Sequence, residues 1–90
     1  MKAQALVARN LRRLRVRRDL SQENLAVDAG VDRTYVSRLE RGLENPTVAV
    51  LEKLAKALDS QIAEFFRVPK PGELPPKPLP PGRRSNFRKK

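Results

Sequence analysis

Apolar residues recur every three or four positions from the start of the chain to about residue 66, which is the spacing of one face of an α-helix. This pattern predicts five short helices and no strand. In the first helix, over about residues 2–18, the apolar face comprises Ala3, Leu6, Val7, Leu11 and Leu14. In the fourth, which follows a turn at Asn45-Pro46, it comprises Val48, Leu51, Leu54, Ala55 and Leu58.

Residues that favour helix ends separate these segments. Serine, threonine and aspartate side chains cap the first turn of a helix, whereas glycine readily adopts the left-handed conformation that ends one. The expected caps are Ser21, Asp32 and Thr47, with Asp59 or Ser60 before a short fifth helix that contains Ile62, Phe65 and Phe66. The expected helix ends are Asp19-Leu20, Gly30 and Gly42.

The second and third helices are joined by a very short turn, because only Val31 lies between Gly30 and the cap at Asp32. A turn of this length that contains glycine holds two helices at a steep angle, and it is typical of the helix-turn-helix unit. Val36 and Leu39 would then anchor the third helix to the core. The residues on its opposite, outward face are Arg33, Thr34, Ser37 and Arg38.

The composition changes near Val68. Residues 67–90 contain seven of the eight prolines, and they hold eight basic residues against a single acidic one, Glu73. Proline at this density is incompatible with helix interiors and sheet ladders. We therefore expect a compact helical domain over residues 1–66, followed by an extended, flexible, basic tail over residues 67–90. In the tail, Arg83, Arg84, Arg88, Lys89 and Lys90 could add contacts to a nucleic-acid backbone.

The net charge of +10 favours a polyanionic partner, with nucleic acid first and an anionic membrane surface second. The chain has no cysteine and no histidine, so disulfides, thiolate zinc sites and histidine-based nucleophile systems are excluded. The acidic residues are scattered, and no glycine-rich phosphate loop is present. We expect no enzyme activity, no cofactor and no metal. With neither a signal peptide nor an apolar run of about 20 residues, a cytoplasmic protein is expected.

The stretch SQENLAVDAGVDRTYVSRLERGLENPT closely resembles the helix-turn-helix regulators of the phage Cro and repressor type, also called the xenobiotic-response-element family. The resemblance extends over about residues 6–66 and excludes the tail. The positions in register are Ser21-Gln22, Leu25-Ala26, Gly30, Val36, Leu39-Glu40, Gly42 and Asn45-Pro46. It implies a lambda-repressor-like domain that places the third helix, about residues 32–41, in the major groove of double-stranded DNA.

The resemblance also implies residue roles. Base contacts are expected from Arg33, Thr34, Ser37 and Arg38, and backbone contacts from Gln22, Tyr35, Arg41 and Asn45. Arginine can donate two hydrogen bonds to guanine, although outward arginines are also typical of a solvated helix face. The ring of Tyr35 could equally be packed beside the helix. Arg15 and Glu40 should form an ion pair between the first and third helices, and Glu44 departs from the basic residues that many relatives have in this loop.

The expected function is a sequence-specific transcriptional regulator, a repressor rather than an activator, that acts as a homodimer. Ile62, Phe65 and Phe66 either contact a second copy or simply close the core. One alternative is an antitoxin or interaction module whose tail binds a protein partner and whose DNA binding is autoregulatory. Another is a nonspecific nucleic-acid binder driven by the basic tail.

Overall fold

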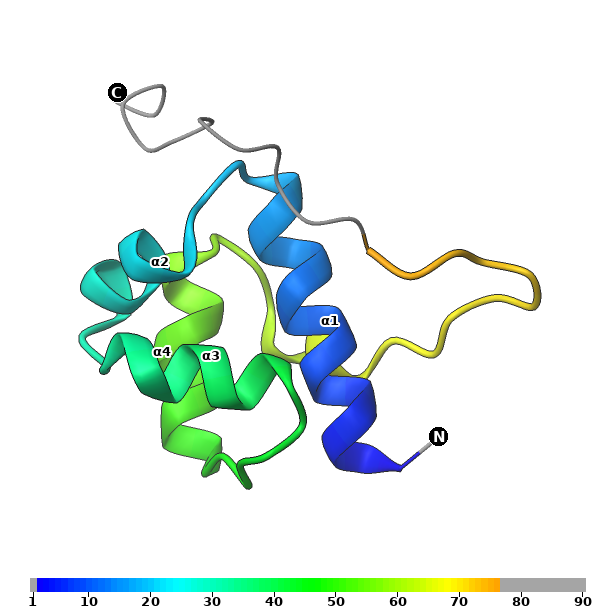
Figure 1. Cartoon of the computed structure of the whole chain (residues 1–90), viewed down its shortest axis with the longest axis horizontal. Coiled ribbons are helices and arrows are strands. Elements are labelled where there is room, and N and C mark those ends of the chain that lie inside the picture. The colour runs from blue at the N-terminus through cyan, green and yellow to red at the C-terminus, as the bar shows by residue number, and fades with distance from the viewer. Residues whose placement is uncertain (1, 77–90) are drawn as a thin grey trace.

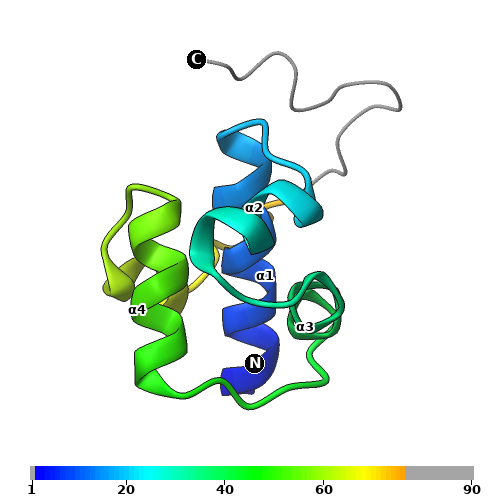
Figure 2. The same ribbon diagram turned by 90° about the vertical axis from the view of Figure 1, so that its left-hand side faces the viewer.

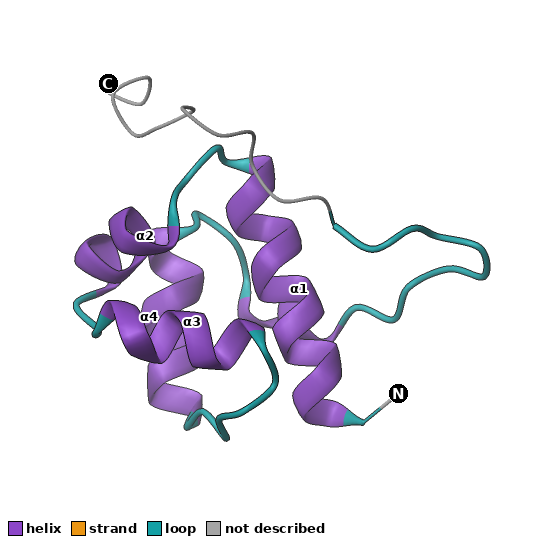
Figure 3. Cartoon of the chain, in the orientation of Figure 1, coloured by secondary structure: helices purple, strands orange, loops and turns teal. Residues whose placement is uncertain are grey.

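The computed structural model describes residues 2–76, which form an all-helical bundle without strands in that range (Figures 1 and 3). Its four α-helices are α1 (Ala3–Arg17), α2 (Gln22–Ala29), α3 (Arg33–Glu40) and α4 (Val48–Ala57). A short 3₁₀ helix, η1 (Ile62–Phe66), follows them. The all-α prediction is confirmed, but the fifth helix is 3₁₀ rather than α.

The helices α2, α3 and α4 begin directly after the capping residues that the sequence predicts. Ser21 Oγ accepts a hydrogen bond from the Asn24 backbone N–H at 3.0 Å, and Thr47 Oγ1 accepts one from Val50 at 3.1 Å. The Asp32 carboxylate accepts one from the Thr34 backbone N–H at 3.1 Å. Each bond satisfies a donor that the first helical turn would otherwise leave without a partner.

The prediction that Asp59 or Ser60 caps the last helix is wrong. Asp59 takes a left-handed conformation with φ of 52°, and the Ser60 backbone N–H donates to the Ala55 carbonyl at 2.9 Å. This is the bonding pattern of a helix C-terminus, so both residues belong to the end of α4. Gln61, which has extended backbone and makes no side-chain cap, precedes η1 instead.

The core lies where α1 packs against η1 and α3 while α2 packs against α3 and α4. Figure 2 shows α4 on one side and α3 on the other, with α1 at the back of this view. The largest fully buried side chain is Phe65, with an exposed fraction of 0%. Phe65 therefore closes the core of its own domain and is not available to a second copy, which corrects its place in the expected dimer contact. Phe66, at 47% exposed, remains available.

The described part of the tail, residues 67–76, contains no helix or strand, yet it is bonded to the domain. Glu73 connects it: the carboxylate accepts hydrogen bonds from the Arg67 guanidinium at 3.1 and 3.2 Å and from the Lys70 backbone N–H at 3.0 Å. Arg9 on α1 donates to Glu73 at 3.4 Å and to the Leu74 carbonyl at 2.9 Å. The chain thus loops out beyond η1 and returns to α1 (Figure 1). The tail cations from Arg83 onward lie outside the described residues.

Candidate nucleic-acid interface

The turn between α2 and α3 fixes the direction of α3. Gly30 has φ of +72°, a left-handed conformation that strains any residue with a side chain. The Val31 backbone N–H then donates to the Ala26 carbonyl at 2.9 Å, which closes the turn. Ala26 is buried, and its small side chain lets α3 pack closely against α2. The two helices form the tight helix-turn-helix unit that the sequence predicts.

One face of α3 lies in the core and the other faces solvent. Val36 and Leu39 form the face that is buried in the core. Of the four residues with expected base contacts, Arg33, Thr34 and Arg38 are exposed and Ser37 is half-buried. The structure brings these four to one surface, which we call the outer face of α3. Helical periodicity alone was sufficient to predict this grouping.

A buried carboxylate lies at the C-terminal end of α3. The Glu40 side chain is fully buried and accepts hydrogen bonds from the Arg15 guanidinium through Nε and through a terminal nitrogen at 2.9 Å. Arg12 Nε also donates to it, at 3.3 Å. The predicted ion pair between α1 and α3 is thus confirmed, and Arg12 is a partner that the sequence did not reveal.

Gln22 joins the same cluster. Its side-chain amide donates to Glu40 Oε1 at 3.1 Å, so in the free protein it contacts α3. Among the other expected backbone contacts, Arg41 and Asn45 are exposed, whereas Tyr35 is half-buried beside the core. Partial burial, followed by the negative charge of Glu44, raises the pKa of the Tyr35 hydroxyl above its ordinary value. Tyr35 is therefore uncharged at neutral pH and able to donate a hydrogen bond.

The loop after α3 holds a contact that sequence reasoning missed. Arg38 Nε donates to the Glu44 carboxylate at 2.7 Å, and a terminal nitrogen of Arg38 approaches the Leu43 carbonyl at 3.5 Å. The sequence identified Glu44 only as an unusual anion. Its pairing depends on how residues 41–47 fold back, which apolar periodicity does not report.

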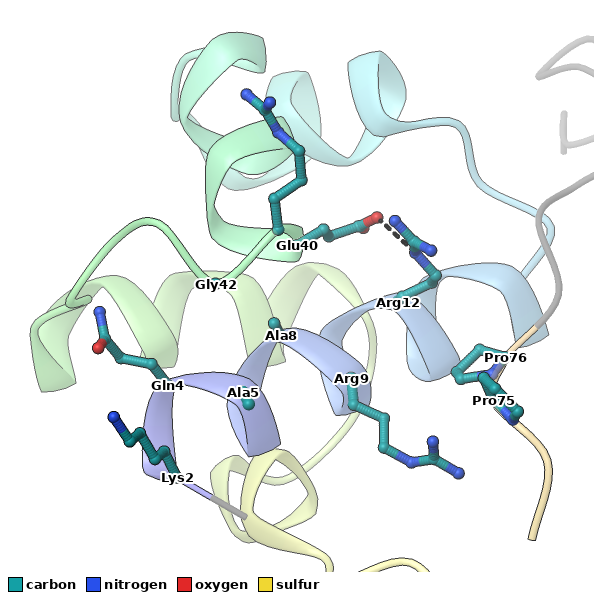
Figure 4. A pocket seen from close by; sticks show the side chains of 11 residues that line it. Lys2, Gln4, Ala5, Ala8, Arg9, Arg12, Glu40, Gly42, Pro75 and Pro76 are labelled. Carbon is teal, nitrogen blue, oxygen red and sulfur yellow. Dashed lines mark hydrogen bonds and ion pairs between the residues drawn. The ribbon is translucent and has the colours of Figure 1, made fainter.

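A groove of about 570 Å³ continues the surface from the end of α3 onto α1 (Figure 4). Its lining residues are Lys2, Gln4, Ala5, Ala8, Arg9, Arg12, Glu40, Arg41, Gly42, Pro75 and Pro76. Figure 4 shows Arg12 turned toward Glu40 and the two prolines beside Arg12. Basic side chains predominate over the single buried carboxylate, so the groove is positively charged next to the outer face of α3.

Among residues 2–76, no helix is both long enough and apolar enough to span a bilayer. The same residues contain no group of three or more acidic, histidine or cysteine side chains placed to bind a metal ion.

Comparison with known families gives a match to the helix-turn-helix model HTH_3 over residues 11–65, more than half of the chain. The chain belongs to this helix-turn-helix family. Its members among the matches include transcriptional regulators, phage repressors and controller proteins of restriction-modification systems. These matches point to DNA-binding transcription regulation.

Individual relatives of this helix-turn-helix protein support the assignment. The regulator SlrR of Bacillus subtilis is 37% identical over 62 residues, which is 68% of this chain but only 41% of SlrR. The crystal structure of the controller protein C.AhdI from Aeromonas hydrophila is 43% identical with a TM-score of 0.68, covering 70% of this chain and 96% of C.AhdI. The controller protein C.Esp1396I, solved as a tetramer with its natural 35 base-pair operator, is 32% identical with a TM-score of 0.68, covering 73% of this chain and 87% of C.Esp1396I.

Proposed function

We propose that this protein is a sequence-specific, DNA-binding transcriptional regulator that reads the major groove with α3. The observation that carries the proposal is the outer face of α3, where Arg33, Thr34 and Arg38 are exposed on a helix that Val36 and Leu39 anchor from below. A helix held in this way can enter a groove as a rigid body, because its own packing does not involve the side chains that meet the bases. The likeness to a controller protein solved on its operator supports the same reading.

Two classes of contact follow from position. Arg33 and Thr34 occupy the first turn of α3, so they read base edges together with Ser37 and Arg38. Tyr35, Arg41, Asn45 and the start of α2 at Gln22 contact phosphates, which fix the register on the duplex without reading its sequence.

The regulator acts as a homodimer on two half-sites about one helical turn apart. Phe66 is 47% exposed and Ile62, also on η1, is partly buried, so these two residues supply the contact between copies. Repression is favoured over activation. The described residues form the helix-turn-helix fold alone, without a second domain that could recruit the transcription machinery, and binding over a promoter is sufficient to block transcription.

Selection of bound duplexes from a random DNA library tests the proposal. The expected result is one enriched inverted repeat, which gives the half-site and the symmetry of the dimer together. Removal of residues 77–90 should leave the enriched sequence unchanged while making the salt dependence of binding shallower. If removal of the tail abolished binding altogether, the nonspecific tail-driven alternative would hold instead.

Single substitutions then separate the two classes of contact. Arg33→Ala should lose preference at one base position of each half-site, worth about 1–3 kcal/mol. Arg41→Ala should weaken binding to all sequences alike and reduce the salt slope by about one. Identical behaviour of the two variants would contradict the assigned roles.

A further inference from the structure

The side chain of Arg38 is already engaged along one edge before any DNA is present. A guanidinium group has two edges that can make paired hydrogen bonds: a side edge formed by Nε and one terminal nitrogen, and an end formed by the two terminal nitrogens. Nε donates to the Glu44 carboxylate at 2.7 Å, and the adjacent terminal nitrogen faces the Leu43 carbonyl at 3.5 Å. The loop therefore occupies the side edge of Arg38.

The other edge remains for a ligand. With the side edge turned to the loop, the end edge is left without a bond to residues 43 and 44: it comprises the second N–H of the terminal nitrogen that faces Leu43 and the N–H groups of the other terminal nitrogen. The end edge, like the side edge, presents a pair of N–H groups that can donate to O6 and N7 of guanine. The Arg38 side chain is 44% exposed, so it is accessible from the solvent side of α3.

Glu44 is held in place rather than free on a mobile loop. Its backbone carbonyl accepts a hydrogen bond from the Gln4 side chain of α1 at 3.1 Å, and the neighbouring Leu43 N–H donates to the Arg38 carbonyl at 3.0 Å. The Glu44 side chain is only 28% exposed, and its charge acts on the Tyr35 hydroxyl as well. Two hydrogen bonds to the loop backbone thus hold the residue that carries this carboxylate beside the outer face of α3.

We propose that Glu44 is a positioning residue for base reading, which holds Arg38 by its side edge and thereby presents its terminal nitrogens to a guanine. The inference rests on the proposed function and deepens it by assigning the specificity of one base position to a pair of residues. An arginine without such a partner would lose side-chain conformational entropy when it binds DNA. The bond to Glu44 orders Arg38 beforehand, so less entropy is lost on binding. The carboxylate also neutralises Arg38 toward phosphates, so this arginine serves recognition more than general attraction to DNA.

The test compares binding preferences of full-length variants in selections from random duplexes. Arg38→Ala first identifies the base position that Arg38 reads, as the position where guanine preference disappears. Glu44→Ala should then lower guanine preference at that same position, and at no other, by about three- to tenfold, the size of ordering one long side chain. Glu44→Gln keeps an oxygen that can accept from Nε without the charge, and its preference should fall between those of the wild type and Glu44→Ala.

Glu23→Ala is the matched control, because Glu23 is an exposed acidic residue in the first turn of α2 and its removal changes the charge equally. It should alter the affinity for all sequences alike. If Glu44→Ala behaves like this control, with unchanged guanine preference, the positioning role is refuted although the proposed function stands. If the wild type itself enriches no sequence, both fall together. Circular dichroism of each variant verifies that the helices are intact.

Discussion

Replacement of Glu40 by glutamine should destabilise the domain more than any change at an exposed acidic residue. The Glu40 carboxylate has an exposed fraction of 0% and accepts hydrogen bonds from Arg15, Arg12 and Gln22. The Arg15 side chain is itself only 8% exposed. Removing the negative charge therefore leaves a guanidinium buried without its counter-ion.

The magnitude follows from that burial. Breaking a buried ion pair by removing one partner costs roughly 3–5 kcal/mol, because the remaining charge stays desolvated. Glutamine retains one oxygen that can accept from Arg15, so we expect about 3 kcal/mol. Small domains have a total free energy of unfolding of about 5–15 kcal/mol, so this is a large share. In a domain of this size it corresponds to a fall in melting temperature of about 12–24 °C.

Urea and thermal unfolding followed by circular dichroism would measure the loss. Glu52→Gln on the exposed side of α4 is the control, and it should change stability by less than about 0.5 kcal/mol. The double variant Arg15→Met, Glu40→Leu should recover much of the loss, since replacing both charges by apolar groups removes the cost of an unpaired charge. A loss below about 1 kcal/mol in Glu40→Gln would show that water reaches the pair, and the reasoning would be refuted.

Two further predictions concern η1 and the segment after it. Phe65→Ala should cost about 3–5 kcal/mol in unfolding free energy, because this side chain is fully buried, whereas Phe66→Ala should cost far less and instead weaken dimerisation in analytical ultracentrifugation. The Arg67 guanidinium, and then the Lys70 backbone N–H, hold the pKa of Glu73 at about 2, below its ordinary 4.5. The attachment of residues 67–76 to α1 is therefore complete above about pH 4.5 and lost as the pH falls toward about 2, and Glu73→Gln should release it at neutral pH. Hydrogen exchange and limited proteolysis of these residues measure both effects, and equal protection in Glu73→Gln and wild type would contradict the second.

Local signals in the sequence predicted most of the fold. Ser21, Asp32 and Thr47 each cap the first turn of the helix that follows them. Gly30 adopts a left-handed conformation because it has no side chain. These helix boundaries are therefore determined by residues that are adjacent in the sequence. The nature of η1 could not be read in this way. The left-handed turn at Asp59 ends α4 late, and the few residues left before Phe65 enters the core form only a short 3₁₀ segment.

Long-range pairing limited what could be predicted about the interface and the tail. The outer face of α3 follows from helical spacing, and the Arg15–Glu40 pair followed from family resemblance. Arg38 and Glu44 are close in sequence, but their contact depends on the path of the loop between α3 and α4. Glu73 attaches to Arg9, which is 64 positions earlier, and composition indicated only an isolated anion among cations. The division of the chain at residue 66 stays a prediction, although the bonds of Glu73 join residues 67–76 to the helical part.

The buried side chains of Val36, Leu39 and Glu40 attach α3 to the rest of the domain. The exposed residues on its outer face therefore contribute little to the stability of the fold. Exchanges at exposed sites of this kind usually alter stability by no more than about 0.5 kcal/mol. Relatives descending from one ancestor can therefore diverge at Arg33 or Thr34 and acquire new target sequences while the scaffold persists unchanged. A library randomised at these two codons would yield many folded proteins, each differing in what it recognises.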